Sequence, residues 1–185
     1  GTNGKTTTST ILFELFKSLG EKVGLISTVE NRIGDEVIPA THTTPDAVSF
    51  NKLLAQMVES GCTYCFMEVS SHALHQHRVA GAQFTGAIFT NLSHDHLDYH
   101  KTFDAYIAAK KMLFDMLPVS AFALVNLDDK KGPTMLQNCK AKIQRTYALK
   151  SMADFKVKII ENQFGGLQLN IDGMDLYAKM VGRFN

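Results

Sequence analysis

The segment Gly1-Thr2-Asn3-Gly4-Lys5-Thr6-Thr7-Thr8 opens the chain with a glycine-rich turn that runs directly into a helical pattern. Glycine at positions 1 and 4 lets the backbone curl so that successive N–H groups point inward and bind phosphate at a helix N-terminus. Lys5 would reach the β- and γ-phosphates, and the Thr6 hydroxyl would ligate Mg²⁺. The stretch predicts a nucleoside triphosphate site. The alternative is a glycine- and threonine-rich helix start without a ligand.

The phosphate-binding motif is incomplete at its upstream side. The full motif has a hydrophobic strand before the loop and a glycine about five positions before the lysine, whereas this chain starts at Gly1. A chain end is not expected inside a catalytic loop. We therefore expect the sequence to be a segment of a larger protein.

Composition predicts an ordinary globular domain. The chain has 185 residues, of which 45% are hydrophobic and 20% charged, enough for one domain with its own core. The net charge of +1 gives no electrostatic case for nucleic acid. No apolar run approaches the ~18 residues of a membrane span.

The three cysteines, Cys62, Cys65 and Cys139, are an odd number. Cys62 and Cys65 lie in an expected strand, where residues three apart face opposite sides, so a shared disulfide or metal is not expected. We interpret all three as core thiols in a reducing cytoplasm.

Alternating strand and helix patterns indicate the α/β class. Strands are expected at residues 22–28, 62–69, 87–90 and 121–126, and helices at 5–19, 44–60, 71–77 and 102–117. The second helix is expected to start with Thr44 as its N-cap and Pro45 at its first position. This alternation predicts a P-loop NTPase-like, mostly parallel sheet with helices on both faces. From about Phe155, short strands broken by glycine turns predict a small antiparallel addition at the sheet edge.

Acidic and histidine side chains gather where strands are expected to end. Glu68 follows an apolar strand, and a carboxylate there can hold Mg²⁺ that bridges phosphates. Residues 90–100 contain three histidines and two aspartates, which suggest zinc or, equally, a phosphate-directed magnesium site that uses one histidine. We expect His42, His75, His94 and His100 to be structural or solvated.

Lys110 falls on the apolar stripe of the helix expected at residues 102–117. A lysine there must be paired, extend to solvent, or lose its charge. Desolvation lowers the pKa of an ammonium group, and a neutral amine can react with CO₂ to form a carbamate that ligates Mg²⁺. A lysine that reaches solvent at the end of the helix is the alternative.

The motifs at 1–8, 43–45, 68–72, 90–100 and 108–110, taken in order, resemble the central ATPase domain of the Mur ligases. The resemblance covers essentially the whole of residues 1–185, and it is greatest to the members that add the third residue of the peptidoglycan stem peptide. It implies an ATP-dependent amide ligase of the cytoplasm. The carboxylate of UDP-MurNAc-L-Ala-D-Glu would attack ATP, and the acyl phosphate would be captured by a diamino acid, either L-lysine or meso-diaminopimelate.

The resemblance also implies residue roles. Lys5 and the surrounding loop would bind ATP, and Asn126 would lie on the nucleotide side. Magnesium would be served by Thr6, Glu68, His96 and Lys110 as a carbamate. The positions that would contact the UDP-MurNAc-peptide are Thr43, Thr44, Ser70, Gln76 and Arg78. Arg78 would pair with a carboxylate or phosphate.

Other readings remain open from the sequence. Folylpolyglutamate, cyanophycin and neighbouring Mur synthetases share this ATPase core, and a non-catalytic nucleotide-binding module is a further alternative. The resemblance implies an N-terminal domain for the uridine end and a C-terminal domain that completes the ATP site. Neither is present in residues 1–185, so we expect this chain alone to be inactive as a ligase.

Overall fold

The computed structural model describes residues 1–93 and 97–179. These residues form two compact units. One unit consists of residues 5–82, and the other consists of residues 1–4 together with the chain from Gln83 onwards. Both units combine helices with parallel strands, so the predicted α/β class is confirmed.

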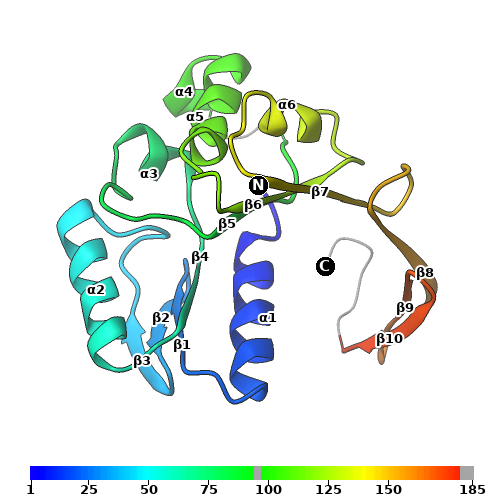
Figure 1. Ribbon diagram of the computed structural model, residues 1–185, viewed down its shortest axis with the longest axis horizontal. Coiled ribbons are helices and arrows are strands. Elements are labelled where there is room, and N and C mark those ends of the chain that lie inside the picture. Colours follow the sequence, from blue (N-terminus) through cyan, green and yellow to red (C-terminus); the bar gives the residue numbers. More distant parts are fainter. Residues whose placement is uncertain (94–96, 180–185) are drawn as a thin grey trace. The chain divides into compact units, whose positions relative to one another are not determined.

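The unit of residues 5–82 contains a four-stranded sheet with the order β3-β2-β1-β4 (Figure 1). Strand β1 runs parallel to β4 and antiparallel to β2, and β2 pairs with β3 across a turn at Gly34. The elements are α1 (Lys5–Ser18), β1 (Val23–Ile26), β2 (Glu30–Ile33), β3 (Glu36–Pro39), α2 (Ala47–Glu59), β4 (Tyr64–Met67) and α3 (Ser71–His75).

Helices cover both faces of this sheet around the fully buried strand β1 (Figure 1). Val23 and Leu25 pack against Phe13 of α1 on one face. Gly24 points to the other face, where a Cβ would lie 2.4 Å from the sulfur of Met57 in α2. Because Ile26 pairs with Met67 in parallel register, the residues that follow β1 and β4 leave the sheet at the same edge.

Helix α2 begins two residues later than the sequence indicated. Its N-cap is Asp46, whose Oδ1 accepts hydrogen bonds from the backbone N–H groups of Val48 and Ser49, each at 3.0 Å. Thr44 is not the cap, because its hydroxyl is buried and donates to the backbone oxygen of Glu68.

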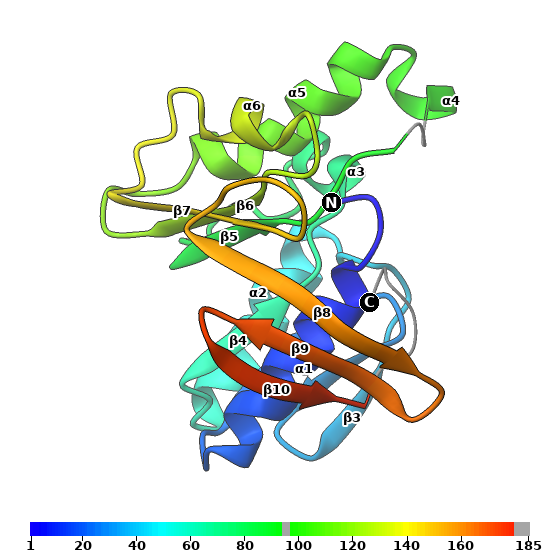
Figure 2. The same ribbon diagram turned by 90° about the vertical axis from the view of Figure 1, so that its right-hand side faces the viewer.

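The other unit contains a six-stranded sheet with the order β10-β9-β8-β7-β6-β5. Strands β5 to β8 are parallel, and β9 and β10 extend β8 as an antiparallel ribbon (Figure 2). The predicted antiparallel addition is thus confirmed. The elements are β5 (Gly86–Phe89), α4 (Leu97–His100), α5 (Phe103–Asp115), β6 (Phe122–Asn126), α6 (Gly132–Leu136), β7 (Ile143–Ala148), β8 (Phe155–Gln163), β9 (Gly166–Ile171) and β10 (Met174–Ala178).

The core of this second unit lies between its parallel strands and helices α5 and α6. Phe89, Val125, Phe114 and Met135 are among its buried side chains. None of the helices within the described ranges, 1–93 and 97–179, is long and apolar enough to cross a membrane.

The interpretation of the cysteines as core thiols is wrong for Cys65. All three cysteines are free thiols, but Cys65 is exposed, and Cys62 and Cys139 are half-buried. Cys65 lies in β4, which is the edge strand of its sheet. Cys62 precedes β4 and does not belong to the strand.

Candidate functional site

Glu68 follows β4 directly and is only 2% exposed. Its carboxylate accepts two hydrogen bonds from one residue at the end of β1: the backbone N–H of Thr28 donates to Oε1 at 2.8 Å, and the Thr28 hydroxyl lies 3.2 Å from Oε2. A buried carboxylate is retained only where such donors compensate its lost hydration. The group is a hard oxygen donor of the kind that magnesium takes.

Thr43 and Thr44 lie beside this carboxylate. The Thr44 hydroxyl donates to the backbone oxygen of Glu68 at 2.9 Å and lies 3.4 Å from the backbone nitrogen of Ser70. The hydroxyl oxygens of Thr43 and Thr28 are 3.1 Å apart. Three residues predicted to contact substrate, Thr43, Thr44 and Ser70, are therefore brought next to the predicted metal ligand. The Ser70 hydroxyl accepts from the N–H of Ala73 and caps α3.

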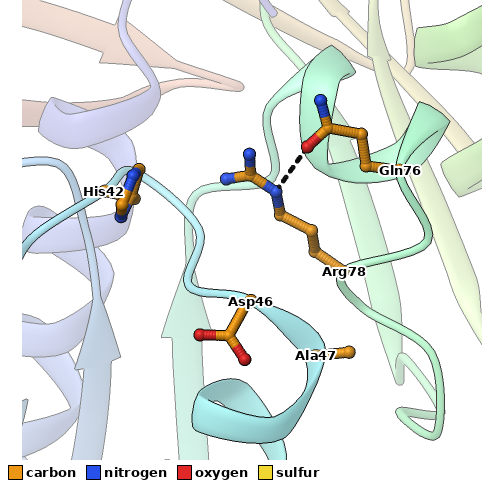
Figure 3. A pocket seen from close by; sticks show the side chains of 5 residues that line it. All are labelled: His42, Asp46, Ala47, Gln76 and Arg78. Carbon is orange, nitrogen blue, oxygen red and sulfur yellow. Dashed lines mark hydrogen bonds between the residues drawn. The ribbon is translucent and has the colours of Figure 1, made fainter.

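A pocket of about 390 Å³ lies in the same unit (Figure 3). Gln76 and Arg78 line it from the segment that follows α3, and His42, Asp46 and Ala47 line it from the start of α2 and the loop before it. The sequence prediction had named Gln76 and Arg78 but not Asp46, and it had treated His42 as structural or solvated.

The Arg78 guanidinium is held on two sides. Its Nε donates to Oε1 of Gln76 at 2.8 Å, and its Nη1 donates to the backbone oxygen of Thr44 at 3.1 Å (Figure 3). Because guanidinium carries five N–H donors, further donors remain for a carboxylate or phosphate. The cation is thereby fixed in orientation before a ligand arrives.

Asp46 gives the pocket a negative group as well. Hydrogen bonds from the Ser49 side chain and from backbone N–H groups of the first turn of α2 hold the pKa of Asp46 below its usual range. The pocket therefore combines one cation with one carboxylate, which suits a ligand that carries an acid group beside hydrogen-bond donors.

The glycine-rich loop belongs to the other unit, where it lies against the residues that follow β5. A Cβ on Gly1 would come within 1.7 Å of the Thr90 hydroxyl oxygen, and Gly4 adopts a φ of +78°. Both positions therefore need glycine. The N–H groups of Thr2 and Asn3 donate to the backbone and side-chain oxygens of Asn91 at 2.8 and 2.9 Å.

These two N–H groups thus contact Asn91. The first residues run beside the chain after β5 and take their partners there. Lys5, Thr6 and Thr7 form the first turn of α1, which starts at Lys5.

Lys110 is 7% exposed, on the buried side of α5, as its place in the apolar stripe predicted. Its Nζ donates to the backbone oxygen of Gly1 at 3.0 Å and lies 4.7 Å from the centre of the Tyr106 ring. The alternative of a lysine that reaches solvent is wrong. The Tyr106 hydroxyl lies 3.0 Å from the hydroxyl of Thr2, so Lys110 and Tyr106 both contact the glycine-rich loop.

Asn126, at the end of β6, bridges two strand ends. Its Nδ2 donates to the backbone oxygen of Thr90 at 2.8 Å, and its Oδ1 accepts from the N–H of Asp128 at 2.9 Å. This places Asn126 next to Thr90, whose hydroxyl donates to the backbone oxygen of Asn3.

His96 lies outside the described residues, as do His94 and Asp95. His100 is buried against the rings of Tyr99 and Tyr106, in keeping with the structural role expected for it. Within residues 1–93 and 97–179, no group of three or more histidine, cysteine, aspartate or glutamate side chains is placed to hold a metal ion.

Sequence reasoning missed Thr28, Asp46, Asn91 and Tyr106. Asp46 carries a signal, because aspartate before an apolar helical stripe is a common N-cap, and Tyr106 lies on the same apolar stripe of α5 as Lys110. Single hydroxyl or amide residues at strand ends have no spacing that marks them.

Parallel strands, a glycine-rich loop before α1 and a buried acid after β4 together define an α/β domain of the nucleotide-binding class. A family model described as the Mur ligase middle domain matches residues 1–185, and the chain belongs to this family.

The chain is also similar to individual members. A Cytophaga hutchinsonii protein named UDP-N-acetylmuramoyl-L-alanyl-D-glutamate--2,6-diaminopimelate ligase is 60% identical over 185 residues, which are 100% of this chain and 38% of that protein. A protein of the same name from Parabacteroides distasonis is 56% identical with the same coverage. A solved structure with that name has a TM-score of 0.89 and 31% identity over 100% of this chain and 39% of its own. The chain thus spans about 38% of the length of these curated relatives.

Proposed function

We propose that this chain is the central domain of a longer UDP-N-acetylmuramoyl-tripeptide synthetase, the MurE type of Mur ligase. The complete enzyme uses ATP to join a diamino acid to UDP-MurNAc-L-Ala-D-Glu in peptidoglycan synthesis. Relatives at 60% and 56% identity over the whole chain carry the name of a diaminopimelate ligase. Meso-diaminopimelate is therefore the proposed amine, with L-lysine as the alternative.

The main structural support is that Thr44 contacts both the proposed metal ligand, Glu68, and the proposed substrate-binding cation, Arg78. Its hydroxyl donates to the backbone of Glu68, and its backbone oxygen accepts from Arg78. A buried carboxylate suited to metal and a cation suited to a substrate acid group are thus fixed to the same residue. This is the arrangement that a carboxylate-activating enzyme needs.

We propose separate roles in binding ATP, substrate and magnesium for the candidate site residues. The proposed ATP contacts are the loop of residues 1–4 together with Lys5, Thr6 and Thr7 of the first turn of α1, and Asn126 is the proposed contact on the nucleotide side. Arg78, oriented by Gln76, binds an acid group of the substrate. Thr6, Glu68, His96 and Lys110 as its carbamate are the proposed magnesium set. Magnesium at this set would neutralise the charge that builds up between two anionic reactants.

The reaction proceeds in two balanced steps. A carboxylate oxygen of the D-Glu side chain attacks the γ-phosphorus of ATP, and the bond to the bridging oxygen breaks as ADP leaves. The amine of the diamino acid then attacks the acyl carbon, phosphate departs, and the amine nitrogen loses a proton as the amide forms. Fixed cations and hydrogen-bond donors favour both steps because they are oriented before charge develops.

The complete polypeptide, rather than this chain alone, is the proposed enzyme. We propose that the remainder holds the uridine end and completes the site for nucleotide and diamino acid. We assign the enzyme to the cytoplasm, in agreement with its three free thiols. Nucleic acid and membranes are not proposed partners.

Phosphate release by the complete polypeptide tests this proposal. ATP, the muramoyl dipeptide and each diamino acid are supplied alone and together, and the products are identified by mass spectrometry. The proposal predicts phosphate and a UDP-MurNAc-tripeptide only when all three are present with diaminopimelate. Phosphate release that is indifferent to the muramoyl substrate would favour a folylpolyglutamate- or cyanophycin-type ligase. Nucleotide binding without any turnover would favour a non-catalytic module.

A further inference from the structure

Among the hydrogen bonds of the described residues, only those of the Thr28 side chain join the Glu68 carboxylate to the Thr43 hydroxyl. Thr28 follows β1 and is exposed, so its hydroxyl is not needed to fill a core. The turn that holds it is fixed by Ser27, whose hydroxyl donates to the backbone oxygen of Glu30 at 2.7 Å. The backbone therefore presents Thr28 to Glu68 without help from the Thr28 side chain.

The protons of these contacts can be assigned. The Thr28 hydroxyl has one proton but two neighbours, Oε2 of Glu68 at 3.2 Å and Oγ1 of Thr43 at 3.1 Å. An ionised carboxylate can only accept, and it is the stronger acceptor. The Thr28 hydroxyl is the donor in both contacts, so its proton is shared between Glu68 and Thr43, with the carboxylate as the stronger acceptor.

The Thr28 hydroxyl therefore affects two side chains, Thr43 and Glu68. The Thr43 oxygen accepts from Thr28, which holds the Thr43 hydroxyl in place beside the site. Two donors from Thr28 fix the rotation of the Glu68 carboxyl group. Loss of a group that orients a ligating side chain in this way typically weakens metal affinity by about 10- to 100-fold.

We propose that Thr28 is a positioning residue that orients Glu68 for the divalent metal and holds the Thr43 hydroxyl for a hydrogen bond with the muramoyl peptide. The proposal rests on the function proposed above. It couples the two sites through one hydroxyl, so that loss of this hydroxyl weakens metal binding and substrate binding together.

The test uses Thr28→Val in the complete polypeptide, since valine keeps the shape of threonine and the backbone N–H but lacks the hydroxyl. Manganese binding is measured by electron paramagnetic resonance in the presence of a non-hydrolysable ATP analogue. We expect a roughly 10- to 100-fold weaker manganese Kd, the range for groups that support metal ligands. Thr28→Ser, which keeps the hydroxyl, should restore the Kd.

Thr63→Val is the matched control, because the Thr63 hydroxyl donates to Glu21 in the same unit at 2.8 Å, away from this site. It should leave the manganese Kd unchanged. A structural role for Thr28 would lower the unfolding temperature without changing the Kd. An unchanged manganese Kd in folded Thr28→Val would overturn the proposal.

The coupling to substrate is tested with Thr43→Val and the double variant. We expect each single change to raise the KM for the muramoyl dipeptide, and the double variant to be no worse than the more damaging single change. Fully additive effects would contradict the link between the two hydroxyls. Wild-type polypeptide that fails to ligate would refute the proposed function, whereas the manganese measurement would still decide the role of Thr28.

Discussion

Glu68 is more deeply buried than Lys110, the other buried ionisable residue of the proposed site in the described part of the chain. It is a carboxylate at 2% exposure whose oxygens are both hydrogen-bonded to Thr28. Burying such a group disfavours its charge unless donors or a cation compensate. The structure supplies the donors, and the proposed magnesium would supply the cation.

Replacing Glu68 by glutamine removes the charge and keeps the shape. We expect ligation by the complete polypeptide to fall by at least about 100-fold, because metal neutralisation of the reacting anions is lost. Product formation is measured at saturating ATP. Glu59→Gln, at the exposed end of α2, is the control and should have wild-type activity. Near-normal turnover of Glu68→Gln would remove Glu68 from the site.

Lys110 allows a chemical test of the carbamate. Lys110→Ala should be inactive and should regain part of its activity with a small added carboxylic acid, which replaces the missing carbamate. Lys111→Ala is the matched control, since Lys111 is the next residue and pairs with Asp115. Full activity of Lys110→Ala without added acid would eliminate the carbamate.

Individual site residues were predictable to different degrees. The burial of Lys110 was predictable from helical periodicity. The position of Glu68 at the end of β4 was predictable because Glu68 follows an apolar run. Thr28 could not be found in this way, because its role arises from the pairing of β1 with β4, which brings residues 40 positions apart together.

At the scale of elements, α2 positions part of the pocket through its first turn. Asp46 caps this turn and also lines the pocket. The capping interaction and the charge of the pocket therefore depend on one carboxylate.

The lowered pKa of Asp46 makes this cap sensitive to acid. A depressed carboxyl pKa contributes stability that is full above the unfolded value of about 3.9 and is lost as pH falls through the folded value. Asp46→Ala should thus lower the unfolding temperature at neutral pH, and the difference from wild type should shrink below about pH 4. Asp46→Asn, which can still cap, should lose less. A difference that is independent of pH would contradict the assigned cause.

Helix α6 begins at Gly132, whose backbone packs closely against the backbone of Asn126 at the end of β6. A Cβ on Gly132 would lie 2.1 Å from the backbone oxygen of Asn126, which cannot move without disturbing the end of β6. We expect Gly132→Ala to cost about 1–3 kcal/mol, as overpacking does, measured by urea unfolding. Gly24→Ala, which meets the flexible end of Met57, should cost less.

Among the elements, long helices, glycine turns and the short helix α3 were predictable, whereas α6 and β7 were not. Helix α1, helix α5 and the turn at Asp172-Gly173, where both residues have positive φ, followed from periodicity and turn chemistry. Helix α6 has five residues, too few for periodicity to show. Strand β7, with the sequence IQRTYA, lacks an apolar run.

At the scale of the whole molecule, the proposed roles are divided between the two units. Residues 5–82 carry Glu68 and the Arg78 pocket, and the other unit carries Lys110 and the glycine-rich loop held by Asn91. The chain spans about 38% of its curated relatives. Sequence comparison defines the family, and the proposed activity is that of the complete polypeptide.

The most direct test of the central claim measures whether an oxygen atom of the substrate carboxylate is transferred to the released phosphate. The complete polypeptide is given ATP, diaminopimelate and UDP-MurNAc-L-Ala-D-Glu with ¹⁸O in the reacting carboxylate. Activation as an acyl phosphate predicts that the released phosphate carries one ¹⁸O atom, because the oxygen that attacked phosphorus leaves with it. Tripeptide formed together with unlabelled phosphate would contradict the account.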